Sequence, residues 1–94
     1  MTYRSDIDIT NTEGFKEIFE FMQFIKLEDF TFNLVKNGFD DLSLLIEEFK
    51  TEAGLTDGNL KEIGINLPGE RARILIKLEE SKNFSLYFLH KFRD

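Results

Sequence analysis

Paired carboxylates are the side chains of this sequence best suited to chemistry. Asp40-Asp41 and Glu47-Glu48 are adjacent acids, and two carboxylates in one site can serve as general acid and base or hold a cation. Neighbouring helix positions face different directions, however, so neither pair converges on a single site. The acids also lack the spacing of an EF-hand loop. We therefore expect no metal site.

The other groups that catalysis or cofactor binding needs are missing or isolated. The sequence has no cysteine, which excludes a disulfide framework, a thiolate metal site and a cysteine nucleophile. The single histidine, His90, lies beside Lys91, which is typical of a surface residue rather than a base or ligand. No glycine-rich phosphate loop or nucleophile elbow is present. We predict a protein that is not an enzyme, with no cofactor and no small-molecule substrate.

Length and composition indicate one small globular domain. The chain has 94 residues, of which 41% are hydrophobic and 32% charged. Its formal charge of −6 argues against general attraction to nucleic acid or to an anionic membrane. No apolar run approaches the ~20 residues of a membrane helix, so we expect no membrane insertion. The N-terminus lacks a signal-peptide pattern, and we expect an intracellular, cytoplasmic protein.

Apolar spacing and helix signals predict helices along most of the chain. One helix face is predicted by the i, i+3, i+4, i+7 spacing of Phe15, Ile18, Phe19, Met22 and Ile25. A second helix is expected over residues 28–36, ended by Asn37-Gly38. We expect phenylalanines 15, 19, 21, 30 and 39 to lie mostly in the core.

Capping residues and proline place three further helices. Asp41 can cap a third helix that begins at Leu42, and Thr56 can cap a fourth that ends near Ile63. Pro68 suits the first turn of a fifth helix, because its missing N–H would be unpaired there in any case. We expect this last helix to continue to about Phe92. The fold class is therefore all-α, a five-helix bundle with a long C-terminal helix.

The order of the motifs resembles the sterile alpha motif (SAM) domain family over about residues 15–80. The opening SAM pattern is matched by Phe21-Met22, Ile25 and Leu27-Glu28-Asp29-Phe30, and the next by Leu34 and Asn37-Gly38-Phe39-Asp40-Asp41-Leu42. Lys61-Glu62-Ile63-Gly64-Ile65 resembles the helix-four signature, and Gly69-Glu70-Arg71-Ala72-Arg73-Ile74-Leu75 resembles the start of the last helix. The resemblance implies a five-helix SAM-type bundle.

Some positions depart from the SAM pattern. Phe21 replaces a common tryptophan, Lys26 stands where glycine is usual, and Glu70 stands where a basic residue or histidine is common. Residues 47–54 look like an insertion. We expect residues 1–12 to be an N-terminal lead-in, residues 13–83 a SAM-like domain, and residues 84–94 an aromatic C-terminal extension that continues the fifth helix.

Charge is divided along the chain in a way that fits the interaction surfaces of SAM domains. Residues 1–35 and 36–69 each carry a net −4, whereas residues 70–94 carry +2. In the SAM family, an acidic mid-loop face meets a basic end-helix face of another SAM domain. The resemblance implies an acidic face of Asp40, Asp41, Glu47, Glu48, Glu52 and Asp57. It implies a basic face of Leu67, Gly69, Arg71, Arg73 and Lys77.

The resemblance therefore implies a protein–protein interaction module that mediates SAM–SAM homo- or hetero-association. We expect its partner to be itself or another SAM domain, within a larger scaffold or signalling protein. One alternative is RNA-hairpin binding through a basic patch of Lys26, Lys61, Arg71 and Arg73, against which the net charge and Glu70 argue. Another is dimerisation through the aromatic C-terminal tail, whose simpler interpretation is packing onto the first helix and onto Ile7 and Ile9.

Overall fold

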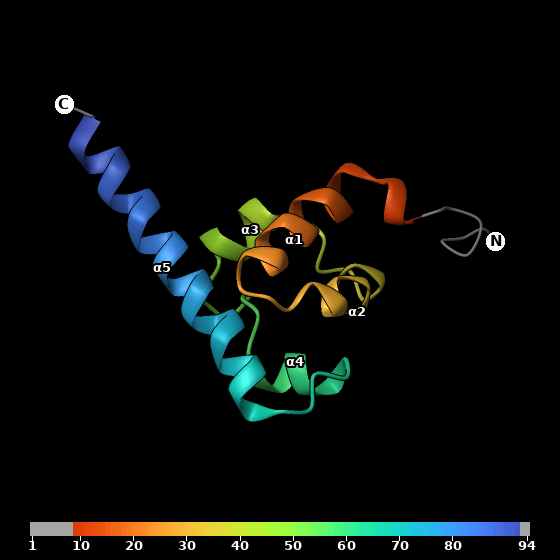
Figure 1. The fold of residues 1–94 in the computed structure, drawn as a ribbon. Coiled ribbons are helices and arrows are strands. Elements are labelled where there is room, and N and C mark those ends of the chain that lie inside the picture. The colour runs from red at the N-terminus through yellow and green to blue at the C-terminus, as the bar shows by residue number, and fades with distance from the viewer. Residues whose placement is uncertain (1–8, 93–94) are drawn as a thin grey trace. The chain divides into compact units, whose positions relative to one another are not determined.

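The structure, a computed structural model, describes residues 9–92, with side chains described as far as residue 84. This part of the chain forms five α-helices and no strand (Figure 1), so the all-α prediction is confirmed. The helices are α1 (Glu13–Phe24), α2 (Thr31–Lys36), α3 (Leu42–Glu47), α4 (Asp57–Glu62) and α5 (Pro68–Phe92). Two short 3-10 turns, η2 (Ile9–Asn11) and η3 (Glu28–Phe30), precede α1 and α2. Ile7 lies outside the described residues.

The described residues fall into two compact units that divide between Leu42 and Ser43. In the first unit, α1 contacts η2, η3 and α2. Its buried side chains are Ile18, Met22, Leu27, Thr31, Leu34 and Val35. In the second unit, α4 contacts α5. Its buried side chains are Phe49, Leu55, Leu60, Ile65, Arg71, Ile74 and Leu78.

The phenylalanines take a different place from the one expected. All five that we assigned mostly to the core are only half-buried, and Phe15 and Phe19 stack at the edge with ring centroids 6.3 Å apart. The residues of this helix face that are fully buried are the aliphatic ones, Ile18 and Met22. Among the phenylalanines whose side chains the structure describes, Phe49, in the expected insertion, is the one that is buried. The helical period was therefore right, and the aromatic rings occupy the margins of the buried stripe.

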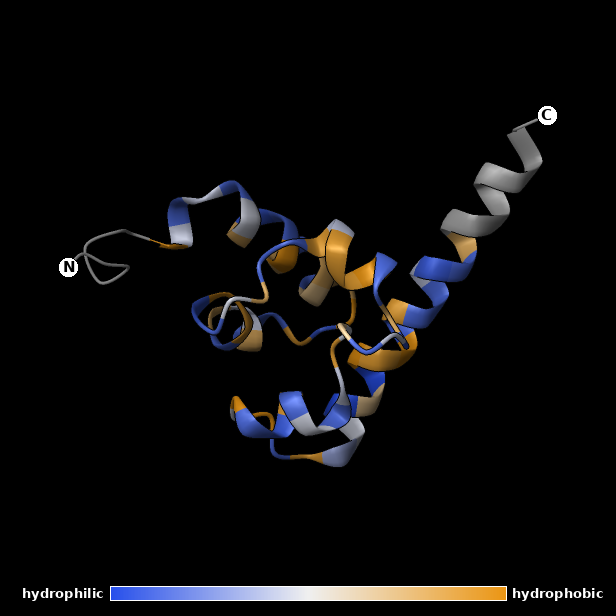
Figure 2. Cartoon of the chain, turned by 180° about the vertical axis from the view of Figure 1, so that it is seen from behind, coloured by the Kyte–Doolittle hydropathy of each residue, from blue (hydrophilic) through white to orange (hydrophobic). Residues whose placement is uncertain are grey.

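Local signals explain where α4 and α5 begin. The Thr56 hydroxyl accepts a hydrogen bond from the Asn59 N–H at 3.0 Å, and the Asn59 side chain accepts one from the Thr56 N–H at 3.0 Å. This reciprocal capping box satisfies two backbone donors at the start of α4. Pro68 is the first residue of α5, as expected. Figure 2 shows that hydrophobic and hydrophilic residues are interspersed along the coloured part of α5.

The second predicted helix is split at its start. Residues 28–30 form the 3-10 turn η3, and α2 begins only at Thr31. The Thr31 hydroxyl donates to the Glu28 carbonyl at 2.7 Å. This bond reaches back three residues, which matches the tighter repeat of a 3-10 turn.

A lysine occupies the left-handed position that ends α1. Lys26 has φ +63°. Its N–H donates to the Gln23 carbonyl, and the Leu27 N–H donates to the Met22 carbonyl. These two bonds form a Schellman motif, in which glycine is the preferred residue at the left-handed position. Gly38 after α2 and Gly64 after α4 occupy the same position, with φ +93° and +107°.

Replacing Lys26 with glycine is expected to raise the free energy of unfolding by about 1 kcal/mol, since glycine adopts a positive φ without the Cβ clash. Urea denaturation would measure the change. Lys26→Ala is the charge control, because it removes the ammonium but keeps the Cβ, and its stability should stay near that of the wild type. Gly64→Ala should move the midpoint in the opposite direction to Lys26→Gly. Equal midpoints for Lys26→Gly and Lys26→Ala would contradict the strain at this residue.

Candidate protein-interaction surfaces

The start of α5 presents an open surface. Leu67, just before the helix, is 61% exposed although it is a large apolar residue. Its carbonyl accepts hydrogen bonds from the N–H groups of Glu70 and Arg71 at 3.0 and 3.2 Å, which fixes the first turn. Gly69 is exposed, and no described atom lies within 4 Å of the position that a Cβ would occupy there. Another molecule can therefore approach the start of α5 closely.

Arg71, which we expected on the basic face, makes its hydrogen bonds to other residues of the second unit. It is only 7% exposed. Its Nη1 donates to the carbonyls of Ile65 and Asn66, both at 3.0 Å, and its Nε donates to Asp57 Oδ1 at 2.7 Å. The guanidinium thus ties the start of α4 and the α4–α5 turn to the first turn of α5. Its role in this structure is to hold the α4–α5 corner together, and little of its surface is left exposed.

The two other cations expected on the basic face differ in exposure. Arg73 is exposed on α5. Lys77 is half-buried, and its Nζ lies 3.9 Å from Glu80 Oε1, one helix turn away. Of the three basic residues, Arg73 is therefore the one best placed to meet a partner. For the RNA alternative, the internal use of Arg71 removes one of the four cations of the expected patch.

Residues 48–54 form a loop that is fixed to α5, which we call the anchored loop. Phe49 is 6% exposed, and its carbonyl accepts a hydrogen bond from Lys82 Nζ at 2.7 Å. Lys50 adopts φ +71°, and its Nζ lies 3.2 Å from Glu79 Oε2. The Lys50–Glu79 pair is exposed and adds little alone. The contacts of Lys50 and Lys82 together dock the loop on α5.

Short contacts of Glu48 with Thr51 and Gly54 hold the two ends of the anchored loop close together. The Thr51 hydroxyl lies 2.8 Å from the Glu48 carbonyl and 2.7 Å from Glu48 Oε1. A Cβ at Gly54 would overlap the Glu48 carbonyl oxygen, so glycine is required for this close approach. Glu52, which lies between Thr51 and Gly54, is exposed. The loop therefore presents a carboxylate on a defined support.

The six acidic candidates are divided between the two units. Glu47, Glu48, Glu52 and Asp57 belong to the second unit, and Asp40 and Asp41 to the first. Glu48 is half-buried through its contact with Thr51, whereas Glu47 and Glu52 are exposed. The Asp57 side chain remains 60% exposed although it pairs with Arg71.

In the first unit, a close approach of two backbone segments positions Asp40 and Asp41. A Cβ at Gly14 would lie 2.6 Å from the Asp40 carbonyl oxygen, so the glycine in α1 allows this contact. Asp40 is half-buried and Asp41 exposed. Gly14 was not singled out in the sequence, because the close approach joins segments that are far apart in the chain.

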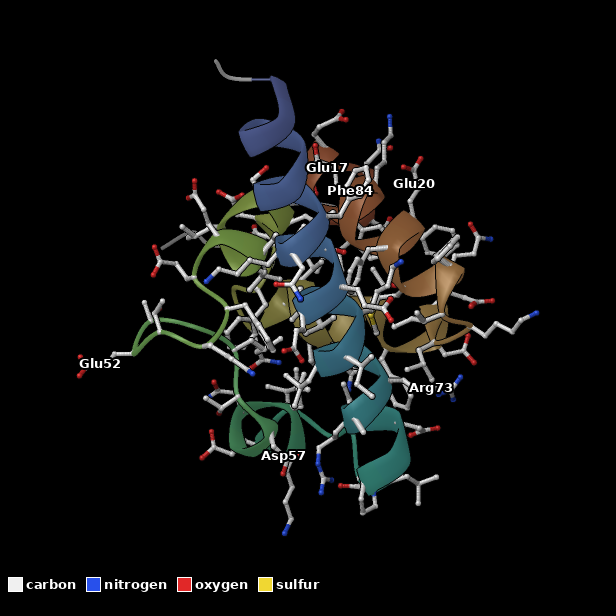
Figure 3. The ribbon with its side chains drawn as sticks, turned by 90° about the vertical axis from the view of Figure 1, so that its left-hand side faces the viewer. Glu17, Glu20, Glu52, Asp57, Arg73 and Phe84 are labelled. Atoms are coloured by element: carbon white, nitrogen blue, oxygen red, sulfur yellow. The ribbon has the colours of Figure 1, made fainter. Side chains whose placement is uncertain are left out.

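Within the second unit, the exposed acidic and basic groups point in different directions. Figure 3 shows Glu52 and Arg73 extending to opposite sides of α5. The described residues contain no cluster of acidic, histidine or cysteine side chains that could hold a metal ion. Among the same residues, no helix is both long enough and apolar enough to cross a membrane.

Comparison with known families identifies this helical arrangement. A family model of the SAM domain (sterile alpha motif) matches residues 10–82. The chain belongs to the SAM family. No curated protein and no solved structure matches it. SAM domains are in general protein-interaction modules and are typically non-catalytic.

The SAM match includes the anchored loop and ends at Lys82, the residue that bonds to the Phe49 carbonyl. α5 continues beyond the match to Phe92 as one helix of 25 residues. Phe84, the first residue of the expected aromatic extension, is 65% exposed. The side chains of residues 85–92 lie outside those described.

Proposed function

We propose that this SAM domain associates head to tail with a second SAM domain, either in another copy of the chain or in another protein. The observation that supports this proposal is the placement of Glu52 and Arg73 on opposite sides of α5 within one compact unit (Figure 3). Two different faces on one molecule make a heterologous contact, which can repeat along an open chain of copies. The host would be a larger intracellular scaffold or signalling protein.

The basic face of the proposed contact combines charge with open apolar surface. Arg73 supplies its main charge, Lys77 adds to it, and Leu67 and Gly69 allow close approach. The acidic face comprises Glu47, Glu48, Glu52 and Asp57 of the second unit, and Asp40 and Asp41, which belong to the first unit, are left out of it. Opposite charges speed encounter and fix the register of the partners. Because an exposed ion pair contributes only about 0–1 kcal/mol, Leu67 and several charges must act together.

Reversing charge on either face is expected to weaken association at least tenfold, which corresponds to about 1.4 kcal/mol. The basic-face variant is Arg73→Glu, and the acidic-face variant is Glu47→Lys/Glu52→Lys, which avoids the internal contacts of Glu48 and Asp57. Sedimentation velocity over a concentration series would measure association. A mixture of the two variants should form one-to-one dimers and nothing larger, because each variant keeps one intact face.

Lys16→Glu is the control for general charge effects, since Lys16 is exposed on α1 of the first unit and belongs to neither face. It should associate like the wild type. A wild type that stays monomeric at millimolar concentration would exclude self-association and leave only a second SAM domain as partner. Tight, salt-sensitive binding of an RNA hairpin would contradict the proposal outright.

A further inference from the structure

The solvent side of α5 carries an exposed stripe that extends beyond the residues of the head-to-tail contact. Its exposed residues are Gly69, Ala72, Arg73, Ile76, Glu80, Asn83 and Phe84, which we call the outward face of α5. At ~100° per residue these positions fall within ~120° of arc, so they form one continuous stripe. The stripe lies opposite the buried Ile74 and Leu78. Ile76 and Phe84 are large apolar residues that are 54% and 65% exposed.

The outward face of α5 is complementary to the outward face of a second copy in the antiparallel orientation. In an antiparallel helix pair centred beside Ile76, residue 73 of one helix lies level with residue 80 of the other, and residue 69 lies level with residue 84. The first match places the Arg73 guanidinium opposite the Glu80 carboxylate. The second places the Phe84 ring over Gly69, where the Cβ position has no described atom within 4 Å. Each match occurs twice because the pair is symmetric.

The two-fold axis of this pair would pass beside Ile76. Residue 76 would then lie close to its own copy, offset by only ~1.5 Å along the helix. Arg73 and Glu80 are displaced in the same direction from the centre of the stripe. Both ion pairs would therefore lie on the same side of the contact between the two helices. The apolar contact of Ile76 with its copy would thus be flanked by the two ion pairs and capped at each end by a Phe84 ring.

We propose that the outward face of α5 is a dimerisation surface whose occupant is the same face of a second copy, in antiparallel orientation. This contact is isologous and closes at two molecules, unlike the head-to-tail contact, which can repeat. It goes beyond the proposed function, because Ile76, Glu80 and Phe84 have no part in that association. Because both contacts use Gly69 and Arg73, one copy of α5 can make either contact but not both at once. The paired length of ~23 Å is short, so the dimer should dissociate on dilution.

Cysteine cross-linking of the full chain tests the proposed axis directly, because the native sequence has no cysteine. Ile76→Cys should form a disulfide-linked dimer under mild oxidation, since residue 76 meets its own copy. Ala72→Cys is the matched control on the same face. It should stay monomeric, because the antiparallel register separates residue 72 from its copy by ~13 Å, too far for a disulfide. Ile76 and Ala72 are both exposed, so neither variant disturbs the core.

Charge exchange provides a second test that separates this dimer from head-to-tail association. Glu80→Arg should weaken the dimer about tenfold, because Arg73 then faces an arginine, whereas Leu67, Gly69 and Arg73 of the head-to-tail basic face are unchanged. Arg73→Glu/Glu80→Arg should restore the dimer but leave head-to-tail association impaired. The readout is the cross-linking yield of each of these charge variants when it is combined with Ile76→Cys. The proposal is overturned if Ile76→Cys cross-links no faster than Ala72→Cys, or if the double exchange fails to recover the yield.

Discussion

Replacing Phe49 with alanine is expected to lower the free energy of unfolding by about 3 kcal/mol, the cost of a cavity at a buried aromatic side chain. Phe49 is 6% exposed, and its backbone carbonyl receives the hydrogen bond from Lys82 that docks the anchored loop on α5. The variant therefore loses apolar burial and loosens the loop that carries Glu52. Urea denaturation followed by circular dichroism would measure the loss.

Phe24→Ala is the matched control, because Phe24 is 72% exposed and its removal should change stability by less than about 0.5 kcal/mol. Phe49→Leu should fall between the two, since leucine keeps most of the apolar volume. If Phe49→Ala proved as stable as Phe24→Ala, residues 48–54 would be a solvated insertion that contributes nothing to the fold.

Replacing Arg71 with methionine is expected to lower the free energy of unfolding by about 2–3 kcal/mol. Methionine keeps an unbranched apolar stem but leaves the carbonyls of Ile65 and Asn66 without their donor. Most of the loss should come from these carbonyls. The Asp57 pair contributes less, because the Asp57 side chain is 60% exposed and its charge is screened by solvent.

Arg73→Met removes the same group two residues along α5, where the side chain is exposed, and should cost less than about 0.5 kcal/mol. Arg71→Lys should recover only part of the loss, because an ammonium cannot reproduce the forked geometry of the guanidinium. Chemical denaturation of the four proteins would rank them. Equal stability of Arg71→Met and Arg73→Met would show that the corner does not depend on the buried guanidinium.

The elements of the fold could be predicted because their signals are local. The capping box of Thr56 with Asn59, the proline at the start of α5 and the glycine after α2 each act within a few residues. Such signals are readable from sequence since the donors and acceptors that they satisfy lie in the same turn. The SAM resemblance rested on the order and spacing of short motifs such as Leu27-Glu28-Asp29-Phe30 and Asn37-Gly38-Phe39-Asp40-Asp41-Leu42, and the family match over residues 10–82 confirms it.

The candidate site was harder to predict, because charge alone does not reveal exposure. Arg71 precedes the buried Ile74 by three residues and Leu78 by seven, so helical spacing already placed it on the buried stripe. The SAM resemblance placed Arg71 on the basic face, and that expectation did not take this spacing into account. Phe49 offered no comparable signal, because its anchor is Lys82, 33 residues along the chain. Tertiary contacts of this range leave no local pattern.

The contacts of Arg71 and those of the anchored loop join residues at different separations along the chain. This difference bears on the order in which the second unit folds. The Arg71 contacts span 5, 6 and 14 residues, whereas the Lys50 and Lys82 contacts with α5 and the loop span 29 and 33. Closing a longer loop costs more chain entropy, so the α4–α5 corner should form first and the anchored loop should dock late. Contacts made after the transition state act mainly on the rate of unfolding. The anchored loop would then determine how long the folded domain lasts rather than how quickly it forms.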